Sequence, residues 1–300
     1  MTLTNNASSV PETIIPPKRH VNWHEAAACA VQIELHNYTD ILDFQTEYIL
    51  GSNSYRIDLL VIRKLSDLII PKNIARSFKR YNLFEIKGFH SSLTISSYYK
   101  TIGYAGLLID QISGPEQFSS LDVTLSFLAF HHPRKLIKHL RNERHLTVAN
   151  LSPGVYDIIN ETFEIQIIVT QELPPEENLY LHCLTDHLRD ASLARRLADD
   201  YTIHKDQDIY TKYLHQLTTA NIKTKGERSM VCEGLFNLFG TSSEEIIARA
   251  KMESKNESDA YYLPKINNLS SQVDYLKNLL RQNNISFDTE SMSDEGNISI

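Results

Sequence analysis

Glycine is scarce in this chain, with only ten glycines among 300 residues. The patterns GxSxG, GxxxxGK and GxGxxG are all absent from the sequence. Each of these patterns builds a glycine-dependent turn, around a nucleophilic serine, nucleotide phosphates or a dinucleotide. Serine-elbow hydrolases, P-loop NTPases and dinucleotide-binding enzymes are therefore disfavoured.

Cysteines are few, and long apolar runs are missing. Cys29, Cys183 and Cys232 are far apart and odd in number, which argues against a disulfide framework and a zinc cluster and is typical of a reducing compartment. No apolar run approaches the roughly 18 residues that a membrane-spanning helix requires. Residues 1–19 are polar, contain three prolines and have no apolar signal core. We expect a disordered lead-in over 1–19, a cytoplasmic location and no membrane partner.

Two strand-like segments, 55–62 and 82–88, carry acidic residues that an ordinary buried strand avoids. Both are rich in β-branched and aromatic residues, and they contain Asp58, Glu85 and Lys87. An unpaired carboxylate in a core costs several kcal/mol. Glu85 and Lys87 are two residues apart, so on a strand they point to the same face. If the two strands are neighbours, two carboxylates and one ammonium meet at a spot suited to Mg²⁺ (or Mn²⁺) and to metal-assisted hydrolysis.

Hydrophobic periodicity predicts an α/β protein with an all-α C-terminal extension. Helices are expected at 23–36, 93–112 and 133–143, and strands at 42–50, 55–62, 82–88, 121–130, 155–159 and 163–169. This core, with its added hairpin at 155–169, is expected over 20–173. A helical domain is expected over 174–256, with helices at 176–199, 206–221, 229–239 and 243–254.

The final helix is expected within 257–284 and carries a heptad seam. Its apolar positions are Tyr262, Ile266, Leu269, Val273, Leu276 and Leu280. Such a seam favours a parallel two-stranded coiled coil, which predicts a homodimer formed through 262–280. Packing of this helix against the helical domain of its own chain is the alternative. Residues 285–300 are polar and acidic, and we expect a disordered tail.

The order helix, strand, strand, strand, helix, strand, with an aspartate on the second strand and Glu-x-Lys on the third, resembles the PD-(D/E)XK nuclease superfamily over residues 23–130. More narrowly, the chain is similar to the recombination-promoting nuclease/transposase branch of that superfamily. The resemblance implies a restriction-endonuclease-like core, a mixed sheet flanked by helices. It also implies a Mg²⁺-dependent nuclease that hydrolyses phosphodiester bonds, with DNA favoured as the substrate and a link to recombination or mobile elements.

The resemblance assigns roles to individual residues of this chain. Asp58 and Glu85 would be metal ligands, and Lys87 would position the attacking water and offset charge on the phosphate. Glu25 matches the glutamate of the first helix as a further metal ligand, with Glu34 and then Glu47 as competing candidates. Two departures are that Ile57 stands where relatives have proline, and that a long insert, 64–79, separates the second and third strands.

The charge distribution supports a nucleic-acid partner. The formal net charge is −7, yet the segment 56–146 contains fourteen Lys or Arg against seven Asp or Glu. This segment therefore carries a net charge of +7, and the rest of the chain −14. A phosphate-facing patch and a solvated helix face both fit this pattern. The candidate nucleic-acid-binding residues are Lys79, Arg80, Lys100, Arg134 and Lys135.

Other readings of the same residues stay open. His24 could touch phosphate, although a solvated helix start is the plainer interpretation. His131 and His132 stand at a strand end without HExxH spacing, which favours a surface or packing role over a catalytic one. The whole chain could also be a nuclease-like fold that no longer cuts and acts as a DNA-binding or protein-interaction scaffold. A third hypothesis is an adaptor that recruits a protein partner through its helical C-terminal half.

Overall fold

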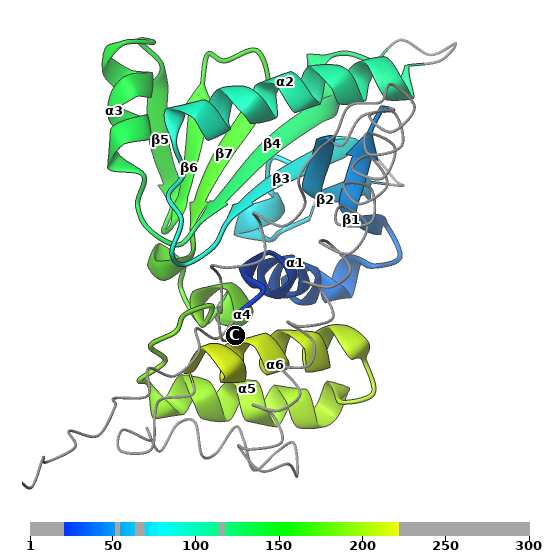
Figure 1. The fold of residues 1–300 in the computed structure, drawn as a ribbon, viewed down its shortest axis with the longest axis vertical. Coiled ribbons are helices and arrows are strands. Elements are labelled where there is room, and N and C mark those ends of the chain that lie inside the picture. Colours follow the sequence, from blue (N-terminus) through cyan, green and yellow to red (C-terminus); the bar gives the residue numbers. More distant parts are fainter. Residues whose placement is uncertain (1–20, 52–54, 64–69, 114–117, 222–300) are drawn as a thin grey trace, which may run out of the picture. The chain divides into compact units, whose positions relative to one another are not determined.

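The protein is an α/β fold built on one seven-stranded mixed sheet (Figure 1). The structure is a computed structural model that describes residues 21–51, 55–63, 70–113 and 118–221. The strands are β1 (Leu42–Leu50), β2 (Tyr55–Arg63), β3 (Tyr81–Lys87), β4 (Val123–Ala129), β5 (Thr147–Ser152), β6 (Val155–Ile159) and β7 (Glu164–Val169). Their order across the sheet is β1-β2-β3-β4-β7-β6-β5.

Three neighbouring strands of this sheet run in the same direction. β3 is parallel to β4, and β4 is parallel to β7, whereas β2 runs antiparallel to β3. The carboxyl ends of β3 and β4 therefore meet at one edge of the sheet, together with the start of β2. In α/β sheets this edge is where ligands usually bind.

Helices cover both faces of the sheet, which explains why its central strands are apolar almost throughout. α2 (Ile95–Ile112) and α3 (Arg134–Asn142) lie on one face, and α1 (Trp23–Glu34) lies on the other (Figure 1). Successive strand residues alternate between the two resulting cores. Leu60 and Leu83 belong to the core under α2, and Leu59 and Phe84 belong to the core under α1.

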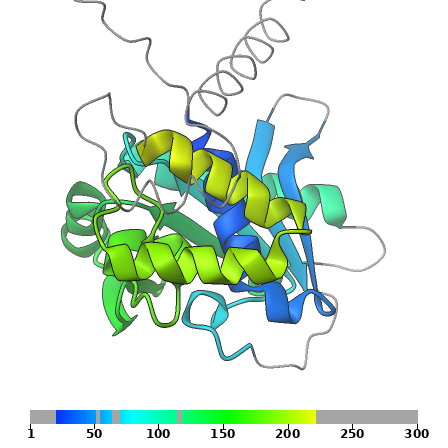
Figure 2. The ribbon, with the colours of Figure 1, turned by 90° about the horizontal axis from the view of Figure 1, so that it is seen from below.

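A further layer of helices packs on the outer side of α1. It consists of α4 (Leu179–His182), α5 (Ala191–His204) and α6 (Asp208–Asn221) (Figures 1 and 2). α1 is buried continuously from Ala26 to Val31, because the sheet lies on one side of it and α6 on the other. A helix that is apolar all round is expected in such an enclosed place.

Most elements predicted from the sequence are present within the described residues. The predictions for α1, α2, α3, α6 and strands β1 to β4, β6 and β7 are confirmed with small shifts of their ends. The predicted strand pair around residue 160 is an antiparallel hairpin of β6 and β7. No strand was predicted at 147–152, where the structure has β5.

The prediction of one helix over 176–199 is wrong. α4 ends at His182, and α5 begins at Ala191. Asp190 starts α5 as its N-cap, since its carboxylate accepts hydrogen bonds from the backbone of Ser192 and Leu193. The described part of the predicted helical domain, α4 to α6, shares one apolar core with α1 and the sheet.

Several predictions fall outside the described residues. They concern the lead-in at 1–19, the helices at 229–239 and 243–254, the coiled coil at 257–284 and the tail at 285–300. None of the described helices has both the length and the apolar character needed to cross a membrane.

Candidate active site at the carboxyl end of β3

Asp58 and Glu85 lie opposite each other on neighbouring strands. β2 pairs with β3 in a register that sets Leu59 against Phe84 and Leu60 against Leu83. Continuing this register by one residue brings Asp58 opposite Glu85. Directly opposite residues project to the same side of a sheet. Both carboxylates are therefore on the α2 side, near the carboxyl end of β3.

Glu85 is a buried carboxylate held by two ammonium groups. Its side chain is 3 % exposed. The Nζ of Lys87 donates to Glu85 Oε1 at 2.6 Å, and the Nζ of Lys100 donates to the same oxygen at 2.9 Å. Lys87 comes from the same face of β3, as the two-residue spacing predicted. A buried carboxylate is tolerated only when such charged partners compensate for its lost hydration.

The capped start of α2 fixes the position from which Lys100 reaches the Glu85 carboxylate. Thr94 is the N-cap of α2 and forms a capping box with Ser97. The ammonium group of Lys100 also lies 5.2 Å from the centre of the Tyr104 ring. Burial lowers the pKa of Lys100, but the hydrogen bond and charge of Glu85 outweigh this effect, so the pKa is raised. Lys100 therefore stays protonated at neutral pH.

Asp58 is fixed from two directions. Its Oδ2 accepts a hydrogen bond of 2.6 Å from the backbone N–H of Ile86. The Nδ1 of His24, in the first turn of α1, lies 3.6 Å from the same oxygen. The hydrogen-bonding interaction with Asp58 raises the pKa of His24, against the lowering effect of burial. His24 thus joins the site from the opposite face of the sheet.

The two carboxylates and two ammonium groups sum to a net charge of zero, and a protonated His24 adds one positive charge. Within the described part of the chain, no group of three or more His, Cys, Asp or Glu side chains is placed to hold a metal ion. Mg²⁺, however, is often held by only one or two carboxylates, with waters and substrate phosphates as its other ligands. Asp58 and Glu85 fit that smaller set. The ammonium groups of Lys87 and Lys100 are suited to binding the oxygens of a phosphate.

The structure does not bring Glu25 to this site. Its backbone N–H is capped by Asn22, and its Oε2 accepts a hydrogen bond of 3.0 Å from Gln216 of α6. The carboxylate therefore faces the outer helical layer. Glu47 lies in β1, at the position opposite Asp58 in the register of β1 with β2. It has a left-handed φ of 51°, is exposed and lies 3.6 Å from Arg56.

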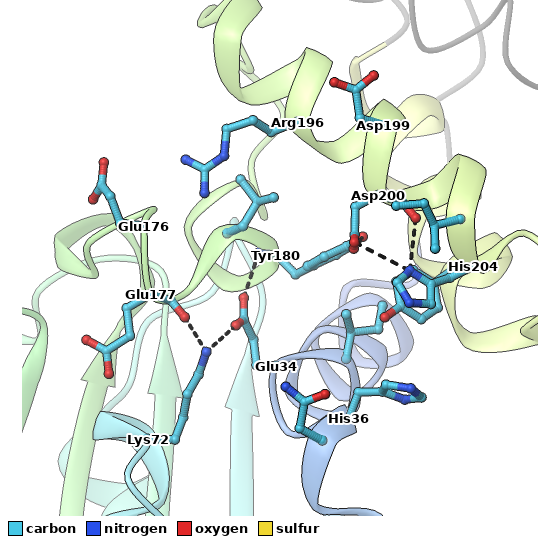
Figure 3. A pocket seen from close by; sticks show the side chains of 15 residues that line it. Glu34, His36, Lys72, Glu176, Glu177, Tyr180, Arg196, Asp199, Asp200 and His204 are labelled. Atoms are coloured by element: carbon cyan, nitrogen blue, oxygen red, sulfur yellow. Dashed lines mark hydrogen bonds and ion pairs between the residues drawn. The ribbon is translucent and has the colours of Figure 1, made fainter.

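Glu34, the competing candidate, lines a different cavity. This cavity is about 540 Å³ and lies among α1, α4 and α5 (Figure 3). Glu34 accepts hydrogen bonds from Lys72 Nζ at 2.7 Å and from the backbone of Tyr180 at 2.7 Å. Lys72 also donates to the carbonyl of Glu177. Burial raises the pKa of Glu34, although Lys72 and the backbone donors act in the opposite direction.

The predicted nucleic-acid-binding residues divide between the two ends of the sheet. Lys79 and Arg80 precede β3, and the length of β3 puts them about 20 Å from Lys87. Lys79 Nζ lies 4.0 Å from Glu164 at the start of β7. Arg134 and Lys135 are exposed at the start of α3, shortly after β4 ends beside Lys87. Lys100, Arg134 and Lys135 thus lie at the edge that carries the candidate site, and Lys79 and Arg80 do not.

The sequence pattern predicts Asp58, Glu85, Lys87 and Lys100 as candidates and offers His24 no more than a phosphate contact. The position of His24, two residues before the alanine-rich run that begins at Ala26, is the one signal for it in the sequence. His132 pairs with Glu172 at 2.9 Å and lies outside this cluster. Comparisons of the chain with protein-family models, curated proteins and solved structures found no match.

Proposed function

We propose that the protein is a Mg²⁺-dependent nuclease with a PD-(D/E)XK core that hydrolyses phosphodiester bonds of nucleic acid, with DNA favoured. One observation carries this proposal. Asp58 and Glu85 project from opposed positions of β2 and β3 to one side of the sheet, with the ammonium groups of Lys87 and Lys100 bound to Glu85. The element order α1-β1-β2-β3-α2-β4 supports the proposal, since the superfamily core has the same order of helices and strands.

Each residue of the cluster has a role in this chemistry. Asp58 and Glu85 would hold the metal ion, and the backbone N–H of Ile86 keeps Asp58 in place. A bound Mg²⁺ or Mn²⁺ would polarise the phosphate and make a water nucleophile available near neutral pH. Lys87 would orient that water and, with Lys100, donate to the phosphate oxygens as negative charge develops on them. Such preorganised donors commonly supply the largest part of the lowering of a reaction barrier.

Incubation of the purified full chain with plasmid and linear DNA, in Mg²⁺ or in EDTA, tests this proposal. We expect cleavage in Mg²⁺ only, and a loss of at least about 100-fold in Glu85→Gln and Lys87→Ala. Lys79→Ala is the matched control, because Lys79 precedes the same strand but lies at its other end. It should cut as the wild type does. Normal cleavage by folded Glu85→Gln would remove the proposal.

A second candidate function is a nuclease-like scaffold that binds DNA without cutting it. The contact of Lys100 with Glu85 favours this alternative, because this second ammonium group balances the combined charge of Asp58 and Glu85. A titration with Mn²⁺ separates the two functions, because a ligand that binds only the folded state raises thermal stability. A catalytic site should gain stability with Mn²⁺, and this gain should vanish in Asp58→Asn. A scaffold should show no gain in either protein.

A further inference from the structure

A group of aromatic rings in mutual contact adjoins the candidate site at the same edge of the sheet. We call Trp23, Phe89, Phe130, His131 and His187 the aromatic platform. The rings of Trp23 and Phe89 are stacked, with centroids 5.8 Å apart and an angle of 27° between their planes. Phe89 also contacts the rings of Phe130, His131 and His187 at centroid distances of 4.2, 5.7 and 6.2 Å.

The platform is joined directly to the acid–lysine cluster. Phe89 follows Lys87 by two residues, and Trp23 precedes His24, which contacts Asp58. Gly88, between Lys87 and Phe89, packs against Trp23, since a Cβ atom at Gly88 would be only 2.7 Å from Trp23 Cβ. Phe130 and His131 follow β4, whose last residue pairs with Lys87. The rings and the ammonium groups of Lys87 and Lys100 thus belong to one edge.

The platform is partly open to solvent. His131 and His187 are exposed, Trp23 and Phe89 are half-buried, and Phe130 is buried. A second aromatic pair adjoins the cluster through Lys100. Tyr55, 49 % exposed, lies 5.8 Å from the ring of Tyr104, above which the Lys100 ammonium is placed.

Partly exposed aromatic rings next to cationic side chains match one chemistry in particular. Proteins that bind single-stranded nucleic acid combine a basic groove for the backbone with aromatic side chains on which unpaired bases stack. In a duplex the faces of the bases are already stacked on each other and cannot reach such rings. Arg134 and Lys135, exposed at the same edge, supply further positive charge for phosphates.

We propose that the substrate at this site is an unpaired stretch of nucleic acid, whose bases stack on the Trp23–Phe89 face of the aromatic platform while its backbone lies along Lys87 and Lys100. This inference rests on the proposed nuclease function and names the substrate class for it. It distinguishes single strands, and junctions or ends with unpaired bases, from continuous duplex.

Trp23 makes the test direct, because it is the only tryptophan of the sequence. In EDTA, where no cleavage occurs, oligothymidylate should quench the Trp23 fluorescence of the full chain, and a duplex of equal length should not. Wild-type affinity should be higher for the single strand. Phe89→Leu should bind the single strand at least about fivefold more weakly, the lower end of the range for one stacked base, with duplex affinity unchanged. Oligouridylate in a parallel titration distinguishes RNA from DNA as the source of the unpaired strand.

Two variants serve as controls. Phe118→Leu removes a half-buried ring that contacts Tyr81 and Arg80 at the other end of β3, and it should bind as the wild type does. Phe89→Tyr keeps the ring and should restore most of the affinity. Circular dichroism and thermal melting identify any variant that fails to fold, in which case the quenching of wild-type Trp23 still decides the question.

The outcomes separate this inference from the proposed hydrolysis. Absence of quenching, tighter binding of duplex by the wild type, or an equal loss in Phe118→Leu would overturn the stacking of unpaired bases. If duplex is cut in Mg²⁺ and no quenching occurs, the hydrolysis stands and this inference falls. If quenching depends on Phe89 and no nucleic acid of either form is cut, the stacking site stands and the hydrolysis falls.

Discussion

The side chains of Glu85 and Glu34 are only 3 % and 6 % exposed, and different surroundings hold their charge. Glu85 has two ammonium groups on one oxygen. Glu34 has one ammonium, from Lys72, and backbone donors at the start of α4. Removing one partner from a buried ion pair is strongly destabilising, because the other charge stays buried. Glu85 has two cations, so losing one of them leaves its carboxylate still paired, and under the proposed function one lysine would be free to bind a phosphate.

Glu34 gives the protein a predictable dependence on pH. Burial raises its folded-state pKa above the ordinary glutamate value, although Lys72 opposes this effect. The folded state therefore holds a proton more readily than the unfolded state, and the stability that this proton contributes is full below the unfolded pKa of about 4.3. It is lost as the pH rises through the folded pKa. In Glu34→Gln this contribution is absent at every pH.

The measurement is urea unfolding of the wild type and Glu34→Gln across the acidic range. We expect the stability of the wild type relative to the variant to decrease as pH rises from about 4.3, in the direction set by the raised pKa. Glu176→Gln is the control, since Glu176 lines the same cavity (Figure 3) but is exposed, so this variant removes a cavity carboxylate without removing a buried one. A relative stability that increases with pH in this range would contradict the burial argument.

Two glycines offer a matched test of backbone conformation. Gly154, between β5 and β6, has a φ of 76°, and an added Cβ would come within 2.7 Å of the backbone nitrogen of Leu173. Gly103, inside α2, has no atom within 4 Å of that position. Gly154→Ala should therefore destabilise the fold by more than about 1 kcal/mol. Gly103→Ala should stabilise it by about 0.5–1 kcal/mol. Equilibrium denaturation of both variants checks the opposite signs.

At the scale of elements, a small polar network ties α2 to the β6–β7 turn. The hydroxyl of Tyr98 donates to Glu161 at 2.9 Å, and Arg144 lies 3.4 Å from the same carboxylate oxygen. Tyr98 is fully buried, and burial, followed by its hydrogen bond to Glu161, raises its pKa. The network fixes the helix that carries Lys100 against the sheet.

Tyr98→Phe should lower the free energy of unfolding by about 1.5–3 kcal/mol, the usual contribution of a hydrogen bond to a charged group. Its neighbour Tyr99 is the matched control, because its hydroxyl bonds to His139 and Arg144 at a site that is 39 % exposed. Tyr99→Phe should cost clearly less, since water replaces its partners. Equal losses in both variants would show that the Tyr98–Glu161 bond does not stabilise the fold.

Local sequence patterns predicted most elements, and the misses have tertiary causes. β1 to β4 follow from runs of branched and aromatic residues, and α2 follows from its apolar period. β5 was missed because it is an edge strand with a single buried residue, which leaves little alternation to detect. The break between α4 and α5 is maintained by Asn221 of α6, which bonds to Leu188 and Thr185. No local pattern reveals a partner more than thirty residues away.

At the scale of the whole molecule, the site residues on strands were predictable and those on α1 were not. The two-residue repeat of a strand fixes the faces of Asp58, Glu85 and Lys87 once β2 and β3 are neighbours. α1 is apolar on almost all sides, so its sequence does not say which face meets the sheet. α6 decides this orientation, and it directs Glu25 toward Gln216 while His24 reaches Asp58.

The basic residues of the segment 56–146 that were candidates for binding nucleic acid lie at two opposite ends of the sheet. Arg134 and Lys135 lie at the edge that carries Lys87, and Lys79 and Arg80 lie at the opposite edge. A nucleic acid bound at the candidate site lies beside the first pair, and it must extend about 20 Å along β3 to meet the second. The paired substitutions Arg134→Glu with Lys135→Glu, and Lys79→Glu with Arg80→Glu, change the net charge equally.

Fluorescence anisotropy of labelled oligonucleotides at several salt concentrations compares the two double variants. If the whole basic segment acted through its overall charge, both variants would lose affinity alike. If binding is local, the Arg134/Lys135 variant alone should bind more weakly, and the slope of log K against log salt should fall by about one to two, since each phosphate contact contributes about 0.7–0.9 to the slope. The Lys79/Arg80 variant should keep the wild-type slope. Equal losses of affinity in both variants would show that nucleic acid does not bind locally at the carboxyl end of β3.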